Sequence, residues 1–114
     1  MNALFLILNQ TDKLDEILET LYDLGVGSTT VDSVGMGKVL LNHNIHPTIF
    51  TSLRNILNED KAYNKTIISV IKDEDILNEA VEKISNILDI DNAPGVGFLF
   101  VMPVVTVRGG YHEN

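Results

Sequence analysis

Apolar positions recur along this chain with two different spacings, which predict its regular elements. Short apolar runs at 3–8, 66–71 and 98–107 are typical of strands, and the β-branched segment 28–34 predicts a further, more polar strand. Between them, apolar residues three and four positions apart predict two amphipathic helices. The first helix carries Leu14, Ile17, Leu18, Leu21 and Leu24, and the second carries Ile76, Leu77, Ala80, Val81, Ile84 and Leu88.

The predicted helices also carry signals at their ends. Thr11 and Asp12 are expected to cap the first helix and Asp73 the second, because side-chain oxygens of these types accept hydrogen bonds from free helix amides. Gly25 is expected to end the first helix, since glycine adopts the left-handed conformation without steric cost.

Strand, helix and strand follow one another twice, on either side of a less regular region. This order predicts an α+β, ferredoxin-like βαββαβ sandwich, in which two helices cover one face of a four-stranded antiparallel sheet. With 114 residues, the chain is expected to form a single domain over 1–114. Between the two βαβ halves, the inserted segment 38–63 carries a predicted helix over 47–57, and a polar loop is expected over 58–64.

Two helices can cover only one face of such a sheet, yet its strands are apolar on both sides. Ala3, Phe5 and Ile7 alternate with Leu4, Leu6 and Leu8, and Phe98, Phe100 and Met102 alternate with Leu99 and Val101. An isolated chain would expose an apolar face on the order of several hundred Å², more than monomers usually tolerate. Either copies of the chain pack with their sheets facing one another, or the helix predicted over 47–57 folds back over this face.

Charge and composition narrow the classes of partner. The net charge of −8 opposes binding to nucleic acid or to an anionic membrane surface. The absence of cysteine excludes disulfides, thiol nucleophiles and thiolate metal sites. The N-terminal apolar run has six residues with no basic region before it, so we expect no secretory signal, no membrane insertion and a cytoplasmic location.

Two glycine motifs are the candidate ligand-binding elements. Gly95-Val96-Gly97 enters the last strand, and its backbone amides are either an anion-binding nest or only a tight turn. Gly35-Met36-Gly37 follows the second strand, and we expect it on the wall of the same cleft between subunits.

The chain resembles the P-II signal-transduction superfamily over most of its length, excluding 38–63. Three segments carry the resemblance: the strand, helix and Gly-Val pair in 3–26, the turn Gly35-Met36-Gly37, and the segment 95–104. The last, Gly-Val-Gly-Phe-Leu-Phe-Val-Met-Pro-Val, is similar to the family's phosphate-binding loop and following strand, Gly-Asp-Gly-Lys-Ile-Phe-Val-x-Pro-Val.

This resemblance implies a homotrimer that holds ATP, ADP or another small ligand in clefts between subunits and signals to a protein partner. The residues 38–63 would take the place of the family's T-loop, although the tyrosine-bearing tip used for uridylylation is missing. The implied ligand-binding residues are Gly35, Met36, Gly37, Gly95, Val96, Gly97, Phe98 and Arg108.

The sequence departs from the family at charged positions of the phosphate-binding site. Phe98 stands in place of the loop lysine, Val96 in place of the aspartate, and Arg108 is the one arginine left of a pair. Arg108 is therefore either a ligand contact or a solvated arginine beyond the last strand. The alternative function is a trimeric structural or interaction module that has lost its ligand.

Other chemistry finds little support in the sequence. His43, His46 and His112 are expected to be surface histidines, because a zinc site needs at least three positioned ligands, so we expect no metal. Lys65 either faces the cleft or is solvated. No serine, histidine and acid set or distinct carboxylate pair stands out, so we predict no catalysis.

Overall fold

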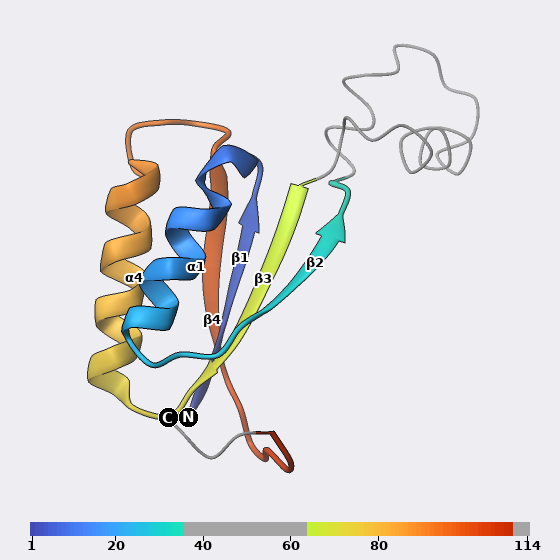
Figure 1. Ribbon diagram of the computed structural model, residues 1–114, viewed down its shortest axis with the longest axis vertical. Coiled ribbons are helices and arrows are strands. Elements are labelled where there is room, and N and C mark those ends of the chain that lie inside the picture. Colours follow the sequence, from blue (N-terminus) through green and yellow to red (C-terminus); the bar gives the residue numbers. More distant parts are fainter. Residues whose placement is uncertain (36–63, 111–114) are drawn as a thin grey trace, which may run out of the picture.

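Four antiparallel strands form one sheet in the order β2-β3-β1-β4, and two helices lie together on one side of it (Figure 1). The computed structural model describes residues 1–35 and 64–110. The strands are β1 (Asn2–Leu8), β2 (Thr29–Ser33), β3 (Asn64–Ile71) and β4 (Gly97–Pro103), and the helices are η1 (Thr11–Lys13), α1 (Leu14–Asp23) and α4 (Glu74–Leu88). This α+β fold is compatible with a small ferredoxin-like arrangement.

The hydrophobic core lies between the sheet and the helices. Leu4, Leu6 and Leu8 of β1 are at most 2% exposed, because successive side chains of a strand alternate between its faces and these three point toward the helices. The same layer of core contains Ile17 and Leu21 of α1, Ile67 and Ile71 of β3, and Leu77, Ala80, Ile84 and Leu88 of α4. The apolar spacing of both predicted helices is confirmed.

The two helices begin differently. Asp73 caps α4 as predicted, since its Oδ1 accepts a hydrogen bond from the Ile76 amide at 3.0 Å. The capping role predicted for Thr11 and Asp12 is wrong, because both residues lie inside the short helix η1, and neither η1 nor α1 has a side-chain cap. Gly25, with φ of 75°, follows the end of α1 in the left-handed conformation as expected.

Two predicted boundaries of strands need correction. β4 ends at Pro103 rather than at Val107, because Pro103 pairs with Asn2, the first residue of β1, and beyond it one further backbone bond, from the Val104 amide to the Met1 carbonyl oxygen, closes the pairing. Asn64 belongs to β3 rather than to the loop predicted over 58–64, and its side chain is only 3% exposed. The helix predicted over 47–57 lies outside the described residues.

The opposite face of the sheet is apolar and open in the described chain. Phe98, Phe100 and Met102 of β4 are 56%, 39% and 49% exposed, and Val31 and Val70 are exposed on the same side. Phe100 stacks on Phe5 with ring centroids 4.9 Å apart, so aromatic groups line the middle of this face. The prediction that two helices leave one apolar sheet face uncovered is confirmed for the described residues.

Candidate functional site

Of the two glycines in the loop that leads into β4, Gly97 is the one whose position requires glycine. Gly97 has a φ of 151°, and a Cβ atom placed there would overlap the carbonyl oxygen of Ile7 in β1. Gly95 also has positive φ, at 84°, but a Cβ there would meet open space. The close backbone approach expected from the sequence is therefore present, and at Gly97 the approaching group is this chain's own first strand.

Hydrogen bonds tie this loop to the turn after β1. The Val96 carbonyl oxygen accepts from the backbone amides of Asn9 and Gln10, at 2.9 and 3.0 Å. The Asn9 side-chain amide donates to the Gly95 carbonyl oxygen at 3.2 Å. Two consecutive carbonyl groups of the loop are thus used internally, which fixes the loop against the end of the sheet.

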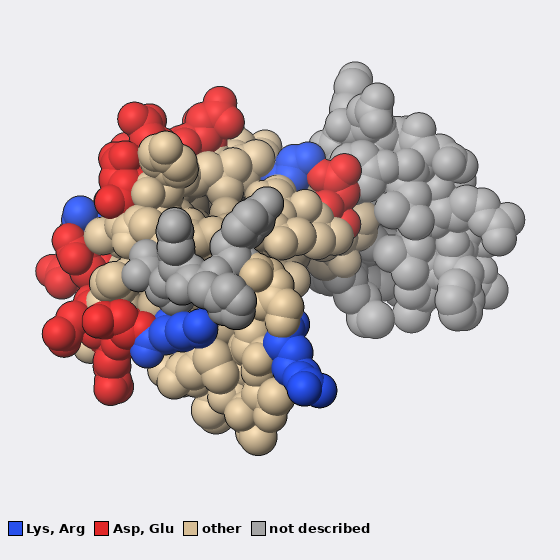
Figure 2. Space-filling view, turned by 60° about the horizontal axis from the view of Figure 1, so that its bottom comes forward, with Lys and Arg blue, Asp and Glu red and all other residues tan. Residues whose placement is uncertain are grey.

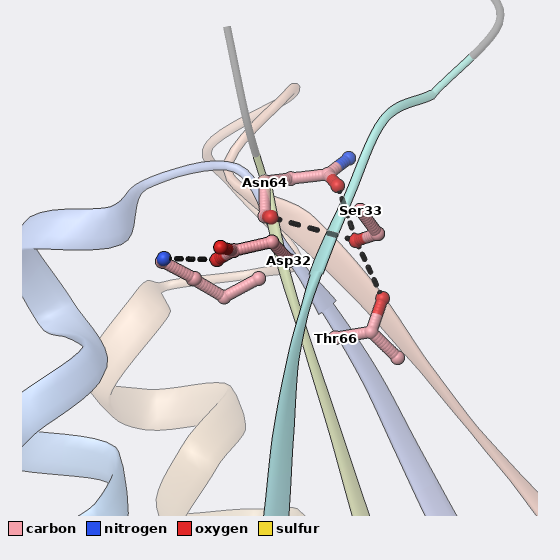
Figure 3. A network of polar contacts seen from close by, with 5 residues as sticks. Asp32, Ser33, Asn64 and Thr66 are labelled. Carbon is pink, nitrogen blue, oxygen red and sulfur yellow. Dashed lines mark hydrogen bonds and ion pairs between the residues drawn. The ribbon is translucent and has the colours of Figure 1, made fainter. Parts of the chain in front are cut away.

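A buried asparagine extends these contacts to the other two strands. The Asn64 side chain donates to Asn9 Oδ1 at 3.1 Å and accepts from the Ser33 hydroxyl at 2.5 Å. Ser33 also contacts the Thr66 hydroxyl at 2.7 Å (Figure 3). The ends of β1, β2 and β3 and the glycine loop therefore share one polar network.

Two further predicted site residues lie at this end of the sheet. Gly35 follows β2, and a Cβ added to it would lie 3.6 Å from the Asn64 side-chain nitrogen. Phe98, which occupies the place of the family's lysine, is on the open face with its ring 6.1 Å from that of Phe100. Met36 and Gly37 lie outside the described residues, so the second glycine motif is represented here by Gly35 alone.

Arg108 lies at the opposite end of the sheet, on the wall of a cavity of about 590 Å³. The strand registers define the two ends, because Leu8 pairs with Gly97 at one end and Asn2 pairs with Pro103 at the other. Six residues of strand separate these pairs, which is roughly 20 Å at about 3.3 Å per residue. The other residues on the cavity wall come from the end of α1 and the turn after it, from β3 and its end, and from the segment after β4, namely Tyr22, residues 25–29, Ile68, Val70, Lys72, Val107, Gly109 and Gly110.

This cavity holds the cations of the described chain that have no carboxylate partner. Lys13, Lys65 and Lys83 form ion pairs with Glu16, Asp32 and Glu79. Lys72 and Arg108 are the remaining lysine and arginine side chains of residues 1–35 and 64–110, no ion pair involves them there, and both line the cavity. Figure 2, in which this end of the molecule comes forward, shows some Lys and Arg atoms beside acidic surface and others beside uncharged surface, with most of the acidic surface to one side.

The structure thus divides the predicted site into two groups within one chain. Gly35 and the loop Gly95–Gly97 lie together at one end, and Arg108 lies at the other end. Lys65 is placed by its ion pair with Asp32, on the side of the sheet that faces the helices. The predicted histidines lie outside the described residues, and within the described ranges no group of His, Cys, Asp and Glu is arranged to hold a metal ion.

Sequence reasoning missed Lys72 and the three polar residues Asn9, Ser33 and Asn64. A signal for Lys72 existed, because it follows Ile68 and Val70 at the alternate positions of β3 and continues their side of the strand. No local signal distinguished the network residues, because their contacts are 31 and 55 residues apart in sequence.

In the part of the chain that the structure describes, no helix is long and apolar enough to cross a bilayer. Comparison with protein-family models and with curated proteins finds no match to this chain. Membership of the P-II superfamily stays a prediction, based on the segments 3–26, 35–37 and 95–104.

Proposed function

We propose that this chain is a P-II-like regulatory protein of the cytoplasm, built as a ferredoxin-like βαββαβ domain with an inserted helix in 38–63. It forms a homotrimer, binds a small anionic ligand between subunits and passes that signal to a protein partner. An adenine nucleotide is the first ligand to test.

One observation carries the proposal: the two groups of candidate ligand residues lie at opposite ends of a sheet whose open face is apolar. A single chain cannot bring Gly95–Gly97 and Arg108 to one small ligand, since roughly 20 Å of strand separates them. Two copies packed through the open face can place the glycine loop of one subunit beside the cavity of the next. The site is then complete only in the oligomer.

The open face supplies a driving force for this assembly. Its exposed aromatic and aliphatic side chains lie on β2, β3 and β4, and covering apolar surface contributes about 25 cal/mol per Å². A closed ring of identical subunits buries this face in every copy, whereas an open chain of subunits would leave it exposed at the ends. Ile68 and Val70 belong both to this face and to the cavity wall, so packing would place the cavity at the edge of the interface.

The cavity has the chemistry of an anion site. Lys72 and Arg108 supply positive charge and form no ion pair within the described residues, and Ser28 and Thr29 supply hydroxyl groups on the same wall. These two cations would neutralise the phosphate charge that the loop lysine neutralises in the family. They would thereby replace the lysine that is missing here because Phe98 stands in its place. Val26, Ile68 and Val70 supply an apolar surface on which a base could rest.

Isothermal titration with ATP, ADP and AMP tests the proposal, using Arg108→Gln, Gly95→Val and Lys83→Gln as variants. We expect saturable binding that Arg108→Gln and Gly95→Val each weaken about tenfold or more, since each removes part of a shared site. Lys83→Gln, which removes a lysine from the exposed Lys83–Glu79 pair on α4, is the matched control and should bind like the wild type.

Mixed oligomers make the test specific for a site between subunits. Co-expression of the Arg108→Gln and Gly95→Val chains should restore some intact sites, because one subunit then supplies an unaltered loop and its neighbour an unaltered cavity. Failure of the mixture to recover any binding would place the site within one chain. No binding of any of the three nucleotides by the wild type would favour the alternative, a trimeric interaction module without a nucleotide.

A further inference from the structure

Asn64 occupies an unusual position for a polar side chain, buried at the point where the ends of three strands meet. It is 3% exposed, and Asn9 and Ser33 satisfy its amide on two sides. Ser33 lies at the end of β2 and Asn64 at the start of β3, so their hydrogen bond joins the two strands between which residues 34–63 run. The same amide leads through Asn9 to the glycine loop.

The donors and acceptors in this network fix one direction along it. Ser33 has a single hydroxyl hydrogen, which it donates to Asn64 Oδ1, so it accepts from the Thr66 hydroxyl. The Asn64 amide nitrogen then donates to Asn9 Oδ1, and the Asn9 amide nitrogen donates to the Gly95 carbonyl oxygen. We call this series Thr66, Ser33, Asn64, Asn9 and Gly95 the amide chain, and bonds that run in one direction strengthen one another.

Turning over both asparagine amides defines a second arrangement of the same hydrogen bonds. If both asparagine amides turn over, the Asn64 nitrogen donates to Ser33, Ser33 donates to Thr66, and the Asn9 nitrogen donates to Asn64 Oδ1. Asn9 Oδ1 then faces the Gly95 carbonyl oxygen, and these two acceptors repel each other. The reversed chain therefore keeps the bonds among Thr66, Ser33, Asn64 and Asn9, but it leaves Asn9 Oδ1 unpaired and loses both the bond to Gly95 and the Ser33 contact with the Asn64 carbonyl oxygen.

From this geometry we infer that the amide chain is a two-state link between the glycine loop and the ends of β2 and β3. Asn64 is its positioning residue: one orientation holds Gly95, and the other releases it. The regulatory meaning rests on the proposed function, because a ligand at the glycine loop that engages Gly95 would bias the orientation of Asn64. The link itself is a property of the unliganded chain.

Hydrogen exchange of the unliganded protein, measured by NMR, tests the link without any ligand. Ser33→Ala removes a donor at the far end of the amide chain, and we expect exchange of the Gly95–Gly97 amides to rise roughly twofold to tenfold. Asp32→Ala is the matched control, since Asp32 is the neighbouring residue of β2, lies on the other face and pairs with Lys65. In the Asp32→Ala variant, the loop amides should exchange as fast as in the wild type.

A thermodynamic cycle distinguishes the link from general loosening. Ser33 and Asn9 share Asn64 as a partner and do not bond to each other. The effects of Ser33→Ala and Asn9→Ala on amide exchange in the loop should therefore be non-additive in the wild-type background. In an Asn64→Ala background they should become additive. Equal exchange in the loop for Ser33→Ala and wild type, or additivity in both backgrounds, would overturn the inference, whatever the nucleotide titrations show.

Discussion

The two ends of the sheet differ in how their polar groups are used. At the glycine-loop end, Asn9, Ser33 and Asn64 bond to one another and to the loop, and the nearby lysine is paired with Asp32. At the cavity end, Lys72 and Arg108 have no described carboxylate partner. The polar groups at the first end bond to one another and so stabilise the fold, and the cations at the second end remain available to a ligand. Substitutions at the first end should therefore change stability, and those at the second should change binding with little change in stability.

The largest loss of stability is expected at the loop end, from Gly97→Val. The new side chain would overlap the Ile7 carbonyl oxygen and would require a φ of 151°, so we expect a loss of about 2–4 kcal/mol in unfolding free energy. Urea denaturation measures this. Gly27→Ala, at the cavity end with open space around it, is the control and should change the midpoint little. Equal effects of the two substitutions would remove the distinction between the ends.

The starts of the two helices allow a smaller comparison, since α1 begins at the loop end and α4 at the cavity end (Figure 1). Asp73→Ala should cost about 1 kcal/mol because it removes the cap on the Ile76 amide. Asp12→Ala should cost less than about 0.5 kcal/mol, because η1 has no side-chain cap. Thermal unfolding of both variants checks the order, which a larger effect of Asp12→Ala would contradict.

A buried hydroxyl between the two ends should give a change of opposite sign. Ser69 in β3 is 2% exposed, points toward the helices and has no hydrogen-bond partner for its Oγ. Ser69→Ala removes this unsatisfied group, so we expect the unfolding free energy to stay equal or to rise by up to about 1 kcal/mol. Ser33→Ala is the matched substitution in a bonded hydroxyl and should lower it. A clear loss of stability for Ser69→Ala would contradict the prediction and would mean that this hydroxyl is hydrogen-bonded within the core.

The smallest effect on stability is expected at the cavity end. Lys72→Gln combined with Arg108→Gln should change unfolding free energy by less than about 0.5 kcal/mol, because neither side chain makes an ion pair within the described residues. The same double variant should lose nucleotide binding in calorimetry. A strongly destabilised double variant would mean that these cations serve the fold rather than a ligand.

Local patterns predicted most of the architecture. Apolar runs located β1, β3 and β4, and the β-branched segment 28–34 located β2. The spacing of residues such as Ile17 and Leu21 located a buried helix face, and Asp73 and Gly25 marked helix ends. The end of β4 could not be read locally, because it depends on where the partner strand β1 begins. Val104–Val107 have strand-like side chains but no strand beside them.

The candidate site was predicted in its parts but not in its arrangement. The glycines of the loop were found because Gly95 and Gly97 need backbone angles that few other residues adopt. Their distance from Arg108 follows from strand register, and the burial of Asn64 follows from contacts with Asn9 and Ser33. Such information lies in the pairing of distant segments rather than in any single stretch.

The assembly of copies through the open sheet face is the claim on which the shared site depends, and light scattering of the purified protein tests it directly. We predict about 38 kDa, three times the 12.6 kDa of one chain. Phe100→Asp, which places a charge on the open face, should return a folded single chain, whereas Asn78→Asp, on the exposed side of α4, should keep the larger mass. A wild-type mass of 12.6 kDa at all concentrations would contradict the account.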